Sequence, residues 1–268
     1  MGKMNNLFYN RDNPKGPVYT SDELAQSNRM KYNNMNEGEK SYKSSKDLHI
    51  DDQQNKWYYY RIDEKGKFDL VGFNPHSGSV MKKVVYGTPN IYEFPEHIIV
   101  ACEGNGETGA VYQFSKDTLM LVQEWEIDGF IWDVKMVDHD VCVSAYVVDL
   151  DTARLYILKG RSIDFVELGT HFAPADLLVF QGNLFISAYP IVETSPRKIL
   201  RLDDEFAIVD EYKVSVCPRF LFENGDEILI QELDVKTGRS DRYSSLNIKT
   251  GEEIISRRKR PKRTKSLI

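Results

Sequence analysis

The chain has 268 residues, of which 41% are hydrophobic and 12% aromatic, a composition typical of a globular protein and not of a disordered one. The formal net charge is −6, but residues 257–265 carry seven positive side chains and no acid, which leaves −13 on residues 1–256. No stretch approaches the roughly 18 apolar residues of a membrane span, and the N-terminus lacks the apolar segment of a signal peptide. We therefore expect a soluble intracellular protein, cytoplasmic or, in a eukaryotic host, nuclear.

Residues 1–45 form a polar N-terminal arm in this prediction. Thr20-Ser21-Asp22-Glu23 has the spacing of a helix capping box, which predicts a short helix over residues 21–32. The segments around Leu7 and Val18 are alternative candidates for a strand that joins a sheet. A mobile arm without fixed structure is the third alternative.

An internal repeat begins after the arm. The triplet Ser144-Ala145-Tyr146 recurs 43 residues later as Ser187-Ala188-Tyr189, and stepping by this interval aligns two columns of residues. The first column consists of Asp47, Asn90, Asp133, Asp176 and Arg219. The second column, 13 positions later in each repeat, consists of Tyr60, Glu103, Tyr146, Tyr189 and Glu232.

Each repeat is predicted to contain four short strands. Apolar runs flank a turn dipeptide between the two columns, as at Gly182-Asn183 and Gly225-Asp226, so the first two strands form a hairpin. In the middle repeats the third and fourth strands are expected at Val111–Phe114, Leu155–Leu158 and Ile199–Leu202, and at Leu119–Trp125, Ile163–Leu168 and Ala207–Lys213. Strands are also expected at Trp57–Ile62, Phe68–Phe73 and Val80–Val85 in the first repeat, and at Leu246–Ile248 and Glu253–Ser256 in the fifth.

This pattern predicts an all-β fold, a five-bladed β-propeller over residues 46–256, because four antiparallel strands per repeat are the blade of a propeller. A β-sandwich would show strands of similar length, but it has no reason to hold a fixed step of 43 residues through five repeats. The predicted organisation is thus an arm (1–45), a propeller (46–256) and a basic C-terminal tail (257–268).

The repeats resemble those of the β-propeller superfamily. Trp132-Asp133 is similar to the dipeptide of WD repeats, although here it opens a repeat. Phe172-Ala173-Pro174-Ala175-Asp176, followed by Gln181-Gly182-Asn183, resembles the blade opening and hairpin of five-bladed arabinanase-type glycoside hydrolases. That resemblance implies catalytic carboxylates where the inner strands begin, at Asp133 and Asp176, but the Asp-Pro opening motif of the family is absent.

The two columns define a candidate ligand-binding site. Since the start of the first strand and the end of the second lie side by side in a hairpin, both columns are expected around one mouth of the central channel. They carry five carboxylates and one arginine, a formal charge of −4, together with three tyrosines. Such a ring suits a cation, a polyamine, a basic peptide or a sugar, because carboxylates bind Ca²⁺ and tyrosine faces attract ammonium groups. The alternative is that these recurrent residues only shape the backbone.

Catalysis is the rival hypothesis for the same residues. A glycoside hydrolase needs two carboxylates about 5–10 Å apart, and the candidates are Asp133 and Asp176 with Glu103 or Glu232. The histidines have no zinc-binding spacing, and no phosphate-binding loop is present. No cofactor is therefore expected, apart from Ca²⁺ as a candidate ion at the channel mouth.

The basic tail is the sharpest linear motif of the chain. It resembles a nuclear localisation signal, and its charges could equally bind the phosphates of nucleic acid or fold back onto the acidic body. Its positive residues are Arg257, Arg258, Lys259, Arg260, Lys262, Arg263 and Lys265. The sequence thus favours a non-catalytic interaction scaffold with a protein or peptide partner. A carbohydrate-cleaving enzyme and a nucleic-acid-associated protein are the alternatives.

Overall fold

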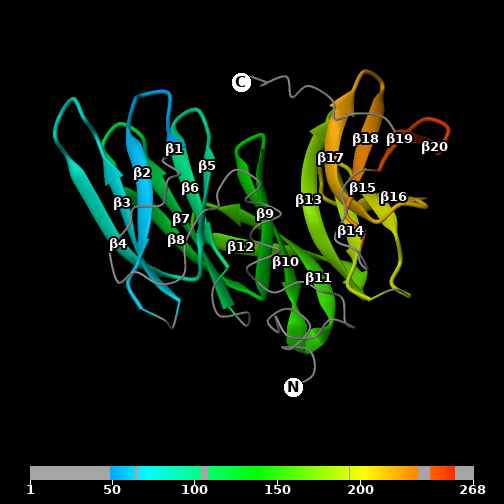
Figure 1. Cartoon of the computed structure of the whole chain (residues 1–268), viewed down its shortest axis with the longest axis horizontal. Helices are drawn as coiled ribbons and strands as arrows, with labels where there is room; N and C mark the ends of the chain where they lie inside the picture. Colours follow the sequence, from blue (N-terminus) through cyan, green and yellow to red (C-terminus); the bar gives the residue numbers. More distant parts are fainter. Residues whose placement is uncertain (1–48, 64–65, 104–107, 193, 235–241, 257–268) are drawn as a thin grey trace. The chain divides into compact units, whose positions relative to one another are not determined.

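The computed structural model describes residues 49–63, 66–103, 108–192, 194–234 and 242–256. These residues form five four-stranded antiparallel sheets (Figure 1). The chain divides into two compact units, and the boundary lies between Ile131 and Trp132. The predicted helix over 21–32, the strand candidates around Leu7 and Val18, and the whole basic tail lie outside the described residues.

The first compact unit contains two sheets, each with its strands in chain order. Sheet 1 consists of β1 (His49–Ile50), β2 (Lys56–Arg61), β3 (Lys67–Phe73) and β4 (Val80–Tyr86). Sheet 2 consists of β5 (Pro89–Glu93), β6 (His97–Cys102), β7 (Thr108–Ser115) and β8 (Leu121–Asp128).

The second compact unit contains three sheets built in the same way, except that β9 begins two residues before the boundary. Sheet 3 consists of β9 (Phe130–Val137), β10 (Asp140–Val147), β11 (Thr152–Lys159) and β12 (Ser162–Thr170). Sheet 4 consists of β13 (Phe172–Phe180), β14 (Asn183–Pro190), β15 (Lys198–Leu202) and β16 (Ile208–Lys213). Sheet 5 consists of β17 (Pro218–Asn224), β18 (Glu227–Glu232), β19 (Tyr243–Asn247) and β20 (Glu253–Ser256).

The burial of each strand follows its place in its sheet. The second strand of sheet 4, Asn183–Pro190, is buried at every position after the first, because neighbouring layers cover both of its faces. The outermost strand of sheet 2, Leu121–Asp128, exposes most of its positions but buries Trp125 and Ile127. Continuous apolar runs and alternating runs are the sequence patterns of these two environments.

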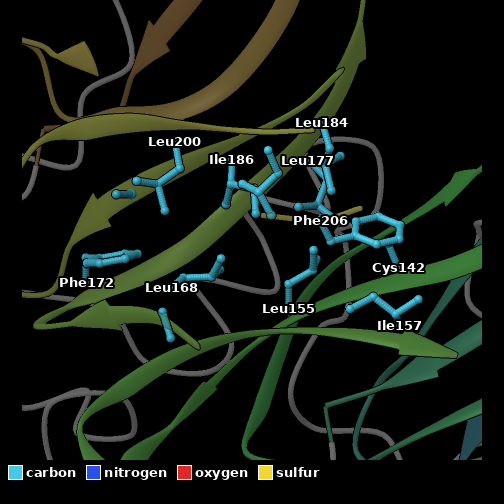
Figure 2. Packing of buried hydrophobic residues seen from close by; sticks show 13 residues of the cluster. Cys142, Leu155, Ile157, Leu168, Phe172, Leu177, Leu184, Ile186, Leu200 and Phe206 are labelled. Atoms are coloured by element: carbon cyan, nitrogen blue, oxygen red, sulfur yellow. The ribbon is translucent and has the colours of Figure 1, made fainter. Parts of the chain in front are cut away.

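Sheets pack face to face through apolar clusters. Between sheets 3 and 4, Leu155 and Ile157 of β11 meet Leu177 and Ile186 of sheet 4 (Figure 2). Similar clusters join sheet 1 to sheet 2 and sheet 4 to sheet 5. Full burial of one such side chain contributes about 1.5–3 kcal/mol relative to leaving it in water. These clusters are the main stabilising contacts between consecutive sheets within each compact unit.

The predicted strands are confirmed in all five repeats, with ends that differ by a few residues. Five repeated four-stranded sheets are the architecture of a five-bladed β-propeller, as predicted. One turn differs from the prediction. The hairpin of sheet 4 turns at Gln181 and Gly182, both with positive φ, so Asn183 already opens β14. Two successive positive φ angles are what a tight hairpin requires, and glycine adopts them without strain.

No helix among the described residues is long and apolar enough to cross a membrane. The three cysteines are free and buried, as expected for thiols that act as small apolar side chains.

Candidate functional site

Two inner strands of the second compact unit, β13 and β17, contain β-bulges where the first column lies. In sheet 4 the register shifts between Pro174 and Leu177, so Ala175 and Asp176 together face Ser187. In sheet 5 a shift leaves Arg219 as the extra residue on β17. A bulge redirects the side chains of its strand. Asp176 therefore lies in the middle of β13, and the prediction that it stands at the start of an inner strand is wrong.

The redirected aspartates reach the next sheet. Asp133 Oδ2 accepts a hydrogen bond of 2.9 Å from the backbone N–H of Leu177, which connects sheet 3 to sheet 4. Asp176 Oδ2 accepts one of 2.7 Å from Leu221 N–H, which connects sheet 4 to sheet 5. The recurrence of aspartate at a 43-residue interval thus has a structural cause, since each carboxylate satisfies a backbone amide that lies just beyond the bulge of the following sheet.

Arg219 replaces aspartate in the last sheet, and it points back along the chain. Its side chain is completely buried, and its Nη1 donates a hydrogen bond of 2.6 Å to the carbonyl oxygen of Ala175. The guanidinium carbon lies 5.3 Å from the ring centroid of Trp132 and 4.4 Å from that of Phe220. Such stacking is favourable for a guanidinium removed from water.

The two aspartates have unusual acidities. Burial raises the pKa of Asp176 well above its ordinary value, and the charge of Asp133 raises it further, whereas Leu221 N–H, Arg219 and Lys135 oppose the shift. Burial also raises the pKa of Asp133, against the backbone N–H groups of Leu177 and Val134 and the same two cations. We term the two aspartates and these two cations the inner-strand charge cluster; its members are Asp133, Lys135, Asp176 and Arg219.

The inner-strand charge cluster contains two carboxylates and two cations, so it has no net formal charge. Lys135 lies two positions after Asp133 on the same strand, and residues at that spacing share a face. The sequence therefore contained a pattern that places Lys135 beside Asp133, but Lys135 belongs to neither column. A neutral cluster does not favour a cation as the predicted anionic ring would. Among the described residues, no group of three or more histidine, cysteine or carboxylate side chains is arranged to hold a metal ion, and Ca²⁺ remains an untested prediction.

The raised pKa of Asp176 predicts a pH-dependent stability. A group with a raised pKa in the fold stabilises fully below its unfolded-state pKa and loses this contribution as the pH rises through the folded-state value. Asp176→Asn removes the charge but keeps an oxygen for Leu221 N–H. We expect the stability of the variant to fall less steeply than that of the wild type between mildly acidic and mildly alkaline pH, as measured by urea unfolding. Identical slopes would contradict the assignment, and Asp204→Asn, on an exposed turn, is the control.

The second column does not oppose the first in the way predicted. Tyr189 pairs with Ala173 and not with Asp176. Tyr146 and Tyr189 are fully buried, so their faces are not exposed walls in this structure. Tyr146 Oη donates to the carboxylate of Asp151, which also pairs with His171 Nδ1; burial, reinforced by Asp151, raises the pKa of Tyr146.

Glu232, the last member of the second column, is 2% exposed. Its carboxylate pairs with Arg242, with 3.1 Å between Oε2 and Nε, and accepts a hydrogen bond of 3.3 Å from Cys217 N–H. These contacts join the end of β18 to Arg242, just before β19, and to Cys217, just before β17.

The first compact unit contains the other predicted members. Asn90 on β5 pairs with Ala101, while Glu103 follows β6 and is 6% exposed. Tyr60 lies half-buried on β2 and stacks edge-on against Tyr58, with 5.2 Å between ring centroids. Asp47 lies outside the described residues, as do the tail residues from Arg257 to Lys265. Their binding and targeting roles therefore stay predictions.

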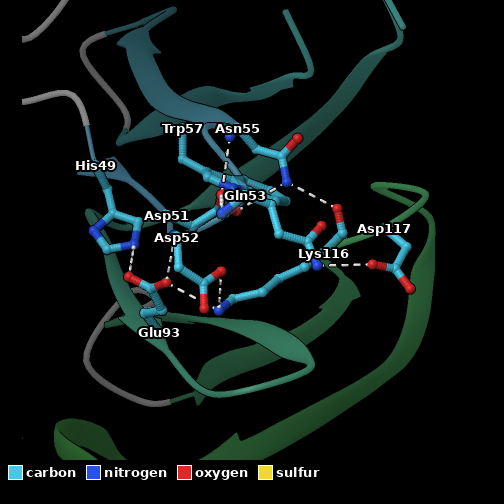
Figure 3. Close-up of polar contacts among 9 residues, drawn as sticks. All are labelled: His49, Asp51, Asp52, Gln53, Asn55, Trp57, Glu93, Lys116 and Asp117. Atoms are coloured by element: carbon cyan, nitrogen blue, oxygen red, sulfur yellow. Dashed lines mark hydrogen bonds and ion pairs between the residues drawn. The ribbon is translucent and has the colours of Figure 1, made fainter. Parts of the chain in front are cut away.

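A polar network between sheets 1 and 2 was missed by the sequence analysis (Figure 3). The side chain of Lys116 is 1% exposed, and its Nζ lies 2.8 Å from Asp52 Oδ1 and 2.9 Å from Glu93 Oε1. Burial alone would lower the pKa of Lys116, but its hydrogen bonds to these two carboxylates raise it overall. Asn55 Nδ2 also donates a hydrogen bond of 2.8 Å to the carbonyl oxygen of Lys116. The network connects the β1–β2 turn to sheet 2. The sequence did not predict it, because residues 52–55 and Lys116 are more than 60 positions apart and no repeat relates them.

Comparison with solved structures finds neighbours that have the β-propeller fold. BamB from Moraxella catarrhalis superposes with a TM-score of 0.54 at 15% identity, over 78% of this chain and 63% of that one. The dihydro-heme d1 dehydrogenase NirN, in complex with DHE, gives a TM-score of 0.50 at 10% identity, over 75% of this chain and 44% of that one. Hsv2 from Kluyveromyces lactis gives 0.45 at 13% identity, over 75% and 59%.

The chain therefore spans less than two thirds of each of these structures. At such low identities the likeness shows the fold alone. No protein-family model matches the sequence, and no curated protein sequence matches it.

Proposed function

We propose that this protein is a non-catalytic binding scaffold for a protein or peptide partner. The observation that carries the proposal is that its candidate catalytic carboxylates already form hydrogen bonds or ion pairs within the fold. Asp133 and Asp176 each hold a backbone amide of the next sheet, and Glu232 is paired with Arg242. A general acid or nucleophile must be able to reach a substrate, whereas these carboxylates are used to join sheets.

The outer surface supports the same proposal. Each of the five outermost strands exposes at least two large apolar side chains, such as Val80 and Val84 on β4 or Ile163 and Phe165 on β12. Rigid sheets with exposed apolar positions suit association with another chain. The basic tail and the partly exposed members of the two columns are further surfaces that we propose for this role, on the basis of the sequence.

A glycoside-hydrolase-like activity is the second candidate, because the raised pKa of Asp176 is a property that a general acid needs. The test is an assay for new reducing ends on a panel of plant and bacterial polysaccharides. We expect no turnover by the wild type. Turnover that disappears in both Asp133→Asn and Asp176→Asn, with folding retained by circular dichroism, would overturn the scaffold proposal in favour of the enzyme.

A further inference from the structure

Sheet 1 packs one face on sheet 2 and leaves side chains of the opposite face exposed. Phe68, Leu70 and Val85 belong to the apolar cluster shared with sheet 2. Side chains alternate along each strand, so the positions next to these three stand on the opposite face. There Val84 is 51% and Tyr86 is 56% exposed, and a contiguous group of exposed apolar side chains marks an interaction surface.

The side chains of this opposite face form rungs across three paired strands. The register aligns Tyr58 on β2 with Val71 on β3, and Val71 with Lys82 on β4. We term this surface the tyrosine face of sheet 1. Its main apolar members are Tyr58, Tyr60, Val71, Phe73, Val84 and Tyr86.

Three lysines and one acid share the tyrosine face. By the same alternation, Lys56 at the start of β2, Lys67 at the start of β3 and Lys82 on β4 belong to it. Within the part of the chain that the structure describes, none of these lysines forms an ion pair, whereas Lys83 on the other face lies 2.9 Å from Glu124.

The charge of the tyrosine face is opposite to that of the body. With Asp69 as its acid, the face carries a formal charge of +2, while residues 1–256 carry −13 in total. β4 is also the only one of the five outermost strands without an aspartate or glutamate. Apolar side chains among unpaired lysines favour a partner that is both apolar and acidic.

The dimensions of the face fit one helix. Three neighbouring strands are about 10 Å across, close to the 10–12 Å diameter of an α-helix, roughly. The seven residues of β3 extend about 20 Å, which is the length of about 13 helical residues.

We infer that the tyrosine face of sheet 1 binds an amphipathic helix of a partner protein, with an apolar stripe flanked by acidic residues. This inference rests on the proposed scaffold function and names its surface and partner. The stripe would cover Val71 and Val84, and acids on its two sides would meet Lys56 on β2 and Lys82 on β4. Asp69, between them on β3, requires a hydrogen-bond donor such as serine within the stripe.

Two other occupants fit the tyrosine face less well. Single-stranded nucleic acid needs open ring faces on which bases stack. Here Lys67 Nζ lies 5.3 Å from the ring centroid of Tyr86, and Tyr58 and Tyr60 pack edge to face. The carboxylate of Asp69 would also repel phosphate. A second copy of the same face would place lysines against lysines, which is unfavourable.

The first test uses the full-length chain and a labelled helical peptide of about 14 residues, with a leucine stripe, one central serine and glutamates on both flanks. A peptide of the same composition, permuted so that it has no stripe, is the control. We expect the striped peptide to bind about tenfold more tightly in fluorescence anisotropy. Methyl resonances of Val71, Val80 and Val84 should shift. Equal affinity, shifts confined to other residues, or tighter binding of an oligo-dT strand overturns the inference.

The second test compares two charge reversals of exposed lysines. Lys82→Glu lies on the tyrosine face, and Lys249→Glu, on the β19–β20 turn, changes the net charge equally. Lys82→Glu should weaken the striped peptide about fivefold more than Lys249→Glu does, with thermal melting unchanged in both variants. Equal weakening would mean an effect of net charge alone and would overturn this site, while the scaffold function itself falls only if polysaccharide turnover is found.

Discussion

Replacing Arg219 with methionine should lower the free energy of unfolding of the second compact unit by about 3–5 kcal/mol. Methionine keeps much of the volume but removes the charge and the hydrogen bond to the Ala175 carbonyl oxygen. Asp133 and Asp176 would then share their site with Lys135 alone, and the pKa of both aspartates would rise further. Since a raised pKa costs stability as the pH increases, the loss should be larger at pH 8 than at pH 5.

Urea unfolding followed by tryptophan fluorescence measures this loss, because Trp132 is stacked on the guanidinium. Asp176→Asn in the Arg219→Met background provides the matched test. If the charge cluster is the cause, the double variant should recover part of the lost stability, and a double-mutant cycle gives the coupling. Additive effects would show instead that Arg219 contributes only through packing.

Replacing Asp51 with alanine should destabilise the first compact unit by about 4 kcal/mol, since each buried donor left without an acceptor costs about 1–3 kcal/mol. Asp51 is 2% exposed. Its carboxylate accepts hydrogen bonds from the backbone N–H groups of Gln53 and Asn55, from Asn55 Nδ2 and from Trp57 Nε1 (Figure 3). Alanine removes all four acceptor contacts at once, and Trp57 is completely buried.

Asp52→Ala is the control for this prediction. Asp52 is the adjacent residue, but its side chain is 64% exposed, and Lys116 keeps Glu93 as a partner without it. The control should lose less than about 1 kcal/mol. Chemical unfolding and the near-ultraviolet circular dichroism of Trp57 report both variants. A small effect of Asp51→Ala would mean that the turn relaxes enough for water to replace the carboxylate.

The sequence predicted the fold because its signals are local and repeated. Apolar runs of strand length, turn glycines and a fixed 43-residue step all act over short distances, and each repeat supplied an independent copy. The burial of Asn183–Pro190 on both faces and the alternation in β8 are visible directly as residue patterns.

The candidate site was predicted less well, for a geometric reason. The spacing of 13 residues between columns gives a correct register only if neither strand contains a bulge. The shift between Pro174 and Leu177 turns Asp176 toward the next sheet and leaves Tyr189 opposite Ala173. The local sequence does not reveal where Asp176 points, because its hydrogen-bond partner, the amide of Leu221, lies across the sheet interface.

The side chains of the inner strands in the second compact unit bond to neighbouring sheets in a fixed order along the chain. Asp133 serves sheet 4 and Asp176 serves sheet 5, whereas Arg219 returns a contact to Ala175 behind it. Aspartate at this position thus bonds to an amide of the following sheet, whereas arginine bonds to a carbonyl of the preceding one. A tandem copy of residues 172–214 would therefore accept the preceding aspartate and present its own to the sheet that follows. Insertion of one more internal repeat between sheets 4 and 5 would therefore need no new type of contact between inner strands.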